Sequence, residues 1–330
     1  MVREEGFFDS ANGTDKIKYY IRRPEGNPRA VIQIVHGMNE YFGRYEELCS
    51  YLCSQGFVVC GHDQLGHGAS VSCDEDLGFF GSDNGDIALV SDVGTLHGIM
   101  KKKYRFLPYV LLGHSFGSFV SRAYAATHHE ELDGLVLSGT SGQRMPVGAG
   151  KLLCKLVAAF KGWRYRSKLV SDVAFSGYNK QFEKKGSTGK EWVTSDPESL
   201  RAYVNDKYCN FRFTLRGFYD MFMIIEYIQS DKWYDDMPKG LPLFLMSGEL
   251  DPVSKGTKGL YELMEKLKDR DMCNIEFVIY KGEHHEPFTG LSRNDAFRDL
   301  AEWTEERIQG VIDARMQSHA ALGVFGRDQK

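Results

Sequence analysis

A serine, an aspartate and a histidine that could together perform nucleophilic catalysis follow one another along the chain. Ser115 is the centre of the pentapeptide GHSFG (113–117), which matches the Gly-x-Ser-x-Gly pattern. An apolar run precedes it and a helical pattern follows, which is the setting of a strand-to-helix turn that lifts a serine hydroxyl clear of a sheet. Side chains at 113 and 117 would clash in so tight a turn, and the helix dipole favours developing negative charge. We therefore predict that Ser115 is a nucleophile.

A serine hydroxyl needs a base, and the base needs an acid that orients it. Asp251 comes directly after the apolar run LPLFLMSG (241–248), and two histidines follow the last apolar run, NIEFVIY (274–280). Residues at the carboxyl ends of parallel strands share one edge of a sheet. The loop that holds His284 and His285 is too short for both to point at Ser115. We expect Asp251 as the acid and His285 as the base, with His284 as the alternative.

Acyl transfer also requires two backbone N–H donors for the oxyanion. One should belong to Phe116, the residue after the nucleophile, and the other to Met38, in the glycine-containing loop that follows the apolar run 30–35. We expect His36 to fix the shape of this loop by hydrogen bonding rather than to act as a second base.

The substrate should contact residues near these groups and residues of an apolar stretch at 211–225. That stretch is either core or the lining of a tunnel for an acyl chain. A basic cluster at 161–168 is either a solvated face or a site that attracts an anionic lipid head group or a membrane surface. The expected substrate contacts are His36, Gly37, His114, Phe213, Phe218 and Phe222, and the basic cluster is Lys161, Arg164, Arg166 and Lys168.

No pattern indicates a metal or an organic cofactor, and we predict neither. The run HDQLGHGAS (62–70) holds two histidines and an aspartate, but zinc-like ligand spacing does not recur elsewhere, so a self-bonded turn is expected. Phosphate-binding glycine patterns are absent. The seven cysteines form no Cys-x-x-Cys pair and suit a reducing compartment, and Cys49 and Cys53 are expected to be buried in a helix.

The composition is that of an ordinary globular protein. The 330 residues carry 41 Lys+Arg and 45 Asp+Glu, a net charge of −4, which makes a nucleic-acid binder improbable. The N-terminus lacks a signal-peptide pattern, and no apolar run approaches the ~18 residues of a membrane span. We expect a soluble, cytoplasmic protein; its oligomeric state stays open.

Short apolar runs alternate with segments of helical period, which indicates a mostly parallel sheet with helices on both faces. The alternation stops between about residues 140 and 236 and then resumes. We therefore predict a core domain from residues 1–140 and 236–330, with residues 141–235 as an inserted helical cap, or lid. Residues from 319 on look weakly ordered or appended. The runs expected as strands are 17–22, 30–35, 57–63, 109–113, 132–139, 241–248 and 274–280, and the helices are 44–55, 83–103, 116–127, 255–268 and 294–309.

Together these motifs resemble the α/β-hydrolase superfamily, and more narrowly its monoacylglycerol lipase and lysophospholipase branch, which is grouped with serine aminopeptidases. The matching stretches are VHGMNEYFGRYEEL (35–48), GHDQLGHGAS (61–70), GHSFGS (113–118), SGELDPVS (247–254) and YKGEHHEP (280–287). The cap stretches AFSGYNKQF (174–182) and FRFTLRGFYDMF (211–222) look like those of bacterial lysophospholipase-like members.

The resemblance implies an α/β-hydrolase fold, His285 as the base, and hydrolysis of a carboxylic ester through an acyl-enzyme, with a monoacylglycerol- or lysophospholipid-like substrate. The chain departs from the family pattern at Tyr41, where histidine is usual, at Phe116, where methionine is common, and at Ser118, where glycine is common. The alternatives are a short-chain carboxylesterase, an aminopeptidase or amidase on the same fold, and a non-catalytic binding relative.

Overall fold

One mostly parallel sheet forms the centre of the protein. In the computed structural model, which describes residues 1–128 and 131–321, the described residues form an eight-stranded sheet in the order β1-β2-β4-β3-β5-β6-β7-β8. β1 pairs antiparallel with β2 and β2 with β4, whereas the other neighbours are parallel. The strands are β1 (Val2–Asp9), β2 (Lys16–Arg23), β3 (Ala30–Val35), β4 (Phe57–His62), β5 (Tyr109–His114), β6 (Gly134–Ser138), β7 (Leu243–Gly248) and β8 (Ile275–Tyr280).

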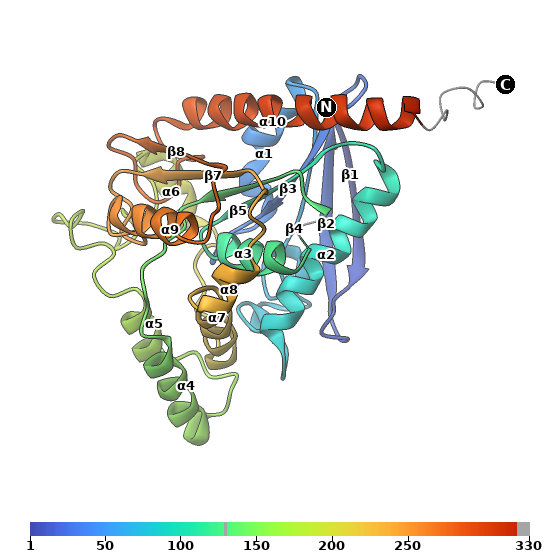
Figure 1. Cartoon of the computed structure of the whole chain (residues 1–330). Coiled ribbons are helices and arrows are strands. Elements are labelled where there is room, and N and C mark those ends of the chain that lie inside the picture. The colour runs from blue at the N-terminus through green and yellow to red at the C-terminus, as the bar shows by residue number, and fades with distance from the viewer. Residues whose placement is uncertain (129–130, 322–330) are drawn as a thin grey trace.

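Helices follow most of the strands and cover both faces of the sheet (Figure 1). The α-helices of the described chain are α1 (Glu46–Ser54), α2 (Gly85–Lys103), α3 (Phe116–His128), α4 (Val147–Lys161), α5 (Lys168–Ala174), α6 (Pro197–Asn205), α7 (Leu215–Ile228), α8 (Asp231–Asp236), α9 (Lys258–Lys268) and α10 (Arg293–Ala321). Short 3-10 turns are η1 (Phe42–Tyr45), η2 (Gly68–Ser70) and η3 (Asp74–Asp76).

The apolar central strands contribute to two separate core layers. Successive side chains of a strand point to opposite faces, so Val31 belongs to the core layer that includes residues of α2, α3 and α9, whereas Ile32 belongs to the layer that includes residues of α1 and α10. All six residues of β3 are buried. This explains why the strand is apolar along its length rather than alternating.

The segment between β6 and β7, which includes residues 141–235, is mostly helical where it has regular structure. It contains α4, α5, α6, α7 and most of α8. In Figure 1, α4, α5 and α7 lie together beyond α3, away from β1 and α10. Side-chain oxygens accept hydrogen bonds from first-turn backbone N–H groups and so fix where four of these helices begin. These N-cap residues are Ser167, Asp196, Thr214 and Ser230.

Arg122 of α3 attaches this inserted segment to the core. Its guanidinium donates to the carbonyl oxygens of Ser141 and Ile228, at 2.9 Å each. Its own carbonyl accepts from the indole of Trp233 at 2.8 Å. Because these buried bonds join α3 to both ends of the segment, they hold it beside the turn that carries Ser115.

The structure extends the sequence predictions at both ends of the chain. Each of the seven apolar runs contains a strand, but β1 was not predicted. β1 lies at the edge of the sheet, and four of its eight residues are charged, so it lacks the apolar run that marks the other strands. α10 continues to Ala321, past the predicted end at Gln309. The rest of the predicted appended tail, residues 322–330, lies outside the described residues.

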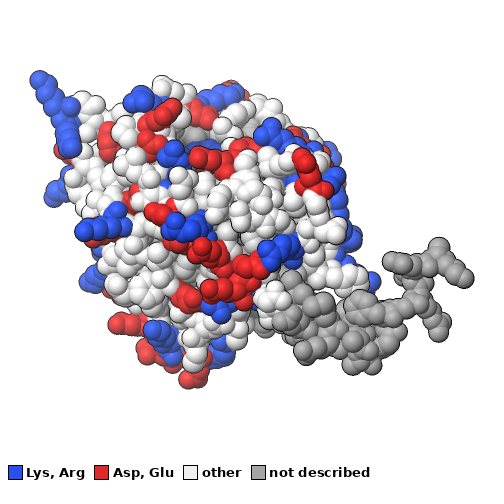
Figure 2. All heavy atoms as spheres, turned by 90° about the horizontal axis from the view of Figure 1, so that it is seen from above, with Lys and Arg blue, Asp and Glu red and all other residues white. Residues whose placement is uncertain are grey.

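The surface carries charges of both signs. Figure 2 shows basic and acidic side chains intermixed on the face seen from above the view of Figure 1. Opposite charges also pair within α10, where Arg298 lies 2.8 Å from Asp295. None of the helices in the described ranges has the combined length and apolar character that crossing a bilayer requires.

Candidate active site

Ser115 occupies the sharp turn between β5 and α3. Its φ angle is +52°, in the left-handed region that residues other than glycine rarely adopt. The flanking glycines are required by space. A Cβ atom at Gly113 would lie 2.6 Å from the carbonyl oxygen of Gly117, and one at Gly117 would collide with the carbonyl oxygen of Val35. The sequence argument for glycine at both positions is thus matched by the geometry.

The structure brings Ser115, His285 and Asp251 into one chain of hydrogen bonds. Nε2 of His285 lies 2.7 Å from Oγ of Ser115, and Nδ1 lies 2.9 Å from Oδ1 of Asp251. Because an ionised carboxylate can only accept, Nδ1 carries the proton and Nε2 is free to accept from the serine hydroxyl. Asp251 follows β7 and His285 follows β8, so both reach Ser115 from the carboxyl edge of the sheet.

The surroundings favour a charged His285 during a reaction. Burial disfavours the charge, but attraction to Asp251 outweighs burial and raises the pKa of His285 above its usual value. His114 packs its ring 5.0 Å from that of His285 and contacts Oγ of Ser138 at 3.1 Å. Burial lowers the pKa of His114 to about 3, with repulsion from His285 adding to it, so His114 is neutral.

His284 is turned away from the serine. Its Nδ1 lies 2.6 Å from the carbonyl oxygen of Glu191, and its ring packs 4.1 Å from that of Phe182. Of the two histidines, His285 is the one that contacts Ser115.

The loop after β3 brings Met38 next to Ser115. Met38 lines the same pocket as Ser115, and Phe116 begins α3. Among the described residues, no hydrogen-bond acceptor contacts the backbone N–H of either residue. Gly37 is tightly placed, because a Cβ there would lie 2.9 Å from the Cβ of Ser115. Asn39 has a φ of +58°, so the loop turns back sharply at this point.

His36 supports this loop from behind. Its Nε2 accepts from the backbone N–H of Gln64 at 2.8 Å, which leaves Nδ1 to donate to the carbonyl oxygen of Gly37, also at 2.8 Å. Burial places the pKa of His36 well below its ordinary value, so the ring is neutral. His36 does not line the pocket. Its hydrogen bonds are those of a residue that fixes the shape of the loop. The predicted contact between His36 and the substrate does not fit its position outside the pocket.

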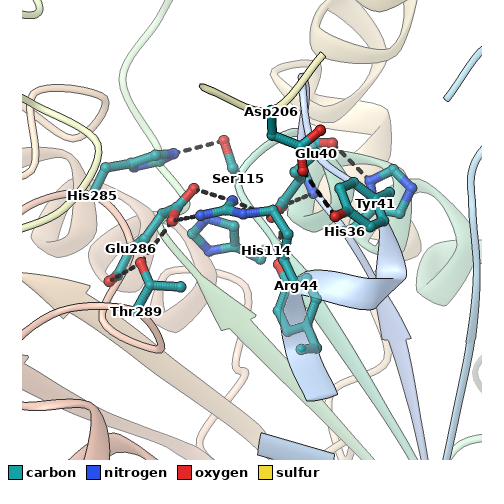
Figure 3. A network of polar contacts seen from close by, with 12 residues as sticks. His36, Glu40, Tyr41, Arg44, His114, Ser115, Asp206, His285, Glu286 and Thr289 are labelled. Carbon is teal, nitrogen blue, oxygen red and sulfur yellow. Dashed lines mark hydrogen bonds and ion pairs between the residues drawn. The ribbon is translucent and has the colours of Figure 1, made fainter. Parts of the chain in front are cut away.

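A buried ion network lies beside the triad (Figure 3). Arg44 donates to both carboxylate oxygens of Glu286, at 2.8 and 2.7 Å, and to Oε2 of Glu40 at 2.9 Å. Glu40 in turn accepts from the backbone N–H of Gly37. Because Glu286 directly follows His285, Arg44 connects the loop after β3 with the loop that carries the histidine.

The two carboxylates of this network differ in their electrostatics. Burial opposes ionisation of Glu286, yet attraction to Arg44 holds the pKa of its carboxyl below its usual value. At Glu40 burial prevails over the attraction to Arg44, and repulsion from Glu286 adds to it, so the pKa is raised. Arg44 therefore stabilises mainly the charge of Glu286.

Tyr41, which stands where the family pattern has histidine, connects the loop after β3 to the inserted segment. Its hydroxyl donates to Oδ2 of Asp206 at 2.8 Å, just beyond α6. Asn39 donates to the carbonyl oxygen of Phe211 at 2.5 Å. The inserted segment thus contacts the loop that holds Met38 through two side chains.

Ser115 and His285 both line a pocket between the core and the inserted segment. Its lining is mostly apolar and includes α7. The core contributes Met38, Asn39, Glu40, His114, Ser115, Phe116, Phe119, Val253, His285 and Glu286, and the inserted segment contributes Met145, Ala174, Phe175, Tyr178, Lys190, Trp192, Val193, Tyr203, Met221, Phe222 and Ile225.

Only part of the predicted set of aromatic substrate contacts lines this pocket. Phe222 does, and so does His114. Phe213 and Phe218 are fully buried and pack with each other, 5.7 Å apart, in the core beneath the pocket. Phe213 also contacts the ring of Phe116 at 6.3 Å. These two side chains point inwards from α7 and the residues before it, so they support the pocket instead of lining it.

The predicted basic cluster is largely engaged by the protein. Arg166 donates to the carbonyl oxygens of Leu77 and Glu75, at 2.5 and 2.8 Å. Arg164 pairs with Asp76, and Lys168 pairs with Asp172 at 2.5 Å. The contacts of Arg164 and Arg166 attach the inserted segment to the loop before α2, whereas the pair of Lys168 and Asp172 lies within α5. The cluster therefore does not form a free basic surface.

The sequence argument missed several pocket residues of the inserted segment. Trp192 packs its ring 5.1 Å from that of His285, and its carbonyl accepts from the backbone N–H of His285 at 3.2 Å. Lys190 and Tyr203 also line the pocket. The composition of residues 184–192 is typical of a turn and gives no signal of a contact with the histidine loop. Phe175 and Tyr178 lie in the stretch 174–182, whose resemblance to other caps was the one available signal.

Comparisons with known proteins agree with this geometry. Residues 26–291 match the protein family described as "Serine aminopeptidase, S33". The monoacylglycerol lipase of Mycolicibacterium smegmatis is 34% identical, over 92% of this chain and 97% of that protein. The monoglyceride lipase of Homo sapiens is 28% identical, over 86% and 85%. A thermostable carboxyl esterase from Bacillus coagulans, solved with glycerol, is 30% identical with a TM-score of 0.83, over 94% and 99%.

The strand order, the sharp turn at Ser115 between β5 and α3, and these matches define an α/β-hydrolase. The predicted fold class is therefore confirmed. The chain belongs to the serine aminopeptidase S33 family and to its monoglyceride lipase-like branch.

Proposed function

We propose that this chain is a serine hydrolase that cleaves carboxylic esters of lipids, with a monoacylglycerol or a lysophospholipid as the substrate class. The observation that carries the proposal is the hydrogen-bonded chain from Ser115 through His285 to Asp251, which opens into a largely apolar pocket. Relatives of similar length named monoglyceride and monoacylglycerol lipase support the assignment to lipid esters.

In the proposed mechanism, Oγ of Ser115 attacks the ester carbonyl carbon while its proton moves to Nε2 of His285. Asp251 stabilises the resulting imidazolium through Nδ1. The proton then passes from Nε2 to the departing alcohol oxygen, and the acyl group stays on Ser115 as an ester. A water molecule, deprotonated by His285, attacks this ester, releases the fatty acid and restores the serine hydroxyl.

The oxyanion that forms in each step would accept hydrogen bonds from the backbone N–H groups of Met38 and Phe116. Their lack of an acceptor among the described residues supports this role. Removal of one such donor typically lowers the rate by about 10²–10³-fold. Glu40, which holds Gly37, would position Met38 through the turn of the loop.

Amide hydrolysis, which the family description raises, is the second candidate. An aminopeptidase needs a carboxylate with a free oxygen to bind the α-amino group of its substrate. The pocket carboxylates Glu40 and Glu286 instead bind Arg44 and their other neighbours through both oxygens. This pairing favours ester over aminopeptide hydrolysis.

Hydrolysis of p-nitrophenyl esters from acetate to palmitate, beside aminoacyl p-nitroanilides, tests the proposal in wild type and Ser115→Ala. We expect ester cleavage that peaks at medium or long chains and disappears in the variant. A peak at acetate would assign a short-chain carboxylesterase instead. Cleavage of anilides without esters would replace the proposal with a peptidase, and activity that survives in Ser115→Ala would refute the triad.

We also propose that residues 141–235 act as a cap that contacts a lipid surface. Five apolar side chains on α4 and α5 support this because each is more than half exposed. Large exposed apolar areas commonly mark membrane or protein contacts. They are Leu152, Leu156, Phe160, Leu169 and Val173.

Sedimentation with phosphatidylcholine vesicles tests this contact. We expect Leu156→Asp and Phe160→Asp to lower the bound fraction, whereas Leu291→Asp, which changes an equally exposed apolar residue outside α4 and α5, should leave it as in wild type. Equal binding by all four proteins would refute a contact through α4 and α5.

A further inference from the structure

We propose that Lys190 is a binding site for a phosphate group on the alcohol part of the substrate, so that the preferred ester is an acylglycerol phosphate rather than a neutral monoacylglycerol. This inference rests on the proposed ester hydrolysis and specifies its substrate class. It assigns a specificity-determining role to a cation in the inserted segment.

The backbone next to Lys190 is joined to the histidine loop. The backbone N–H of His285 donates to the carbonyl oxygen of Trp192 at 3.2 Å, and that of Glu286 donates to Val193 at 2.8 Å. His284 contacts the carbonyl oxygen of Glu191 at 2.6 Å. Lys190 immediately precedes these residues and lines the pocket that contains Ser115. Its place beside the proposed base is therefore fixed by several hydrogen bonds.

The side chain of Lys190 is partly buried and, within residues 1–128 and 131–321, no carboxylate or carbonyl oxygen contacts its ammonium. The pKa of Lys190 is lowered, first by burial and also by repulsion from Arg212. A second cation thus lies within electrostatic range, and the Nε of Arg212 is itself buried without a partner among the described residues. Removing a cation from water without a counter-charge is unfavourable.

Several other buried cations of the described chain are paired. Arg22 binds Glu46, Arg44 binds Glu286, and Arg216 binds Asp220. Arg122, which lacks a carboxylate, donates to two carbonyl oxygens. Lys190 differs from all of these in that it faces the substrate pocket, where an anion of the substrate can supply the missing partner.

The lining of the pocket separates into two chemical parts. Met221, Phe222 and Ile225 of α7 are apolar and belong to the core layer around α3, so they suit an acyl chain. Lys190 lies in the other part of the lining. Cys209 is close to both Lys190 and Tyr203, and Tyr203 lies beside Arg44. A substrate anion at Lys190 would thus lie on the alcohol side of the ester. A phosphate carries about −1.5 to −2 charges near pH 7, which suits a site influenced by two cations.

The test compares kcat/KM for 1-octanoylglycerol 3-phosphate with that for 1-octanoylglycerol, both below their aggregation concentrations. The readout is the ratio of the two values, because a partial loss of folded enzyme cancels in it. The variants are Lys190→Met, which removes the charge, Lys190→Arg, which keeps it, and Lys161→Met, which removes an exposed lysine outside the pocket.

We expect wild type to favour the phosphate ester, and the ratio to fall about ten-fold or more in Lys190→Met, as for loss of a charged hydrogen bond. Lys190→Arg should retain most of the preference, and Lys161→Met all of it. An unchanged ratio in Lys190→Met would overturn the inference. Wild-type hydrolysis of the neutral ester alone would overturn it while leaving ester hydrolysis intact, whereas hydrolysis of neither ester would overturn the proposed function as well.

Discussion

Replacement of Arg44 by methionine should destabilise the protein in a way that depends on pH. The guanidinium makes three hydrogen bonds of 2.7–2.9 Å to Glu40 and Glu286, and the three side chains are 11%, 3% and 7% exposed. Methionine fills a similar volume but leaves two buried carboxylates without a cation. Breaking a buried pair in this way costs about 3–5 kcal/mol.

The sign of the pH dependence follows from the pKa shifts. In wild type the pKa of Glu286 is lowered by Arg44, so this pair contributes stability above the unfolded-state pKa, and the contribution is lost as pH falls. Without Arg44, burial raises the pKa of Glu286, as it already raises that of Glu40. Ionisation then opposes folding increasingly as pH rises. The free-energy loss in Arg44→Met should therefore be largest at pH 8 and smaller at pH 5.

Urea unfolding of wild type and Arg44→Met at both pH values measures this difference. Arg298→Met is the matched control, because its guanidinium pairs with Asp295 on the exposed surface of α10. The control should change the unfolding free energy little at either pH. If Arg44→Met behaved like the control, or lost more stability at pH 5 than at pH 8, the account of the network would be refuted.

Three further predictions concern activity. The value of kcat/KM should fall as pH decreases, with a midpoint above pH 6.5, because attraction to Asp251 raises the pKa of His285. A midpoint below pH 6.5 would contradict this prediction. Phe222→Ala should shift the acyl length that is preferred in an ester series, because Phe222 lines the pocket. Phe213→Ala should chiefly lower the free energy of unfolding, by about 3–5 kcal/mol, because Phe213 lies in the core. The reverse pattern would refute the assignment of Phe222 to the pocket and Phe213 to the core. Tyr41→Phe should lower kcat several-fold, because it removes the hydrogen bond to Asp206 that holds the loop after β3. The control Tyr280→Phe removes a similar hydrogen bond, 3.0 Å long, to Asp299 outside the pocket and should not lower kcat. Equal effects of the two variants would refute the role of Tyr41 in positioning this loop.

The residues of the triad could be predicted because their chemistry is tied to local patterns. Gly-x-Ser-x-Gly indicates a turn, and a polar residue after an apolar strand indicates the carboxyl edge of the sheet. Both histidines follow the same strand, so His284 stayed an alternative to His285, and the family resemblance supported His285. The geometry then separates them by the contact of His284 with Glu191.

Features that depend on contacts distant in sequence could not be predicted. The bond between Arg44 and Glu286 joins positions 242 residues apart, and neither residue type indicates its partner. Phe213 and Phe222 both belong to an apolar stretch, but which of them faces the pocket depends on how α7 packs on α3. Lys190 lies in a turn-like run, so only its hydrogen-bonded neighbours place it beside the histidine loop.

The central claim is that Ser115 is the activated nucleophile, and covalent labelling tests it most directly. Intact-mass analysis after exposure to a fluorophosphonate should show one adduct per chain, and peptide mapping should place it on Ser115. Ser115→Ala should not be labelled, and His285→Ala should react far more slowly although Ser115 is present, because the serine then lacks its base. An adduct on another residue, or equally fast labelling of wild type and His285→Ala, would contradict the account.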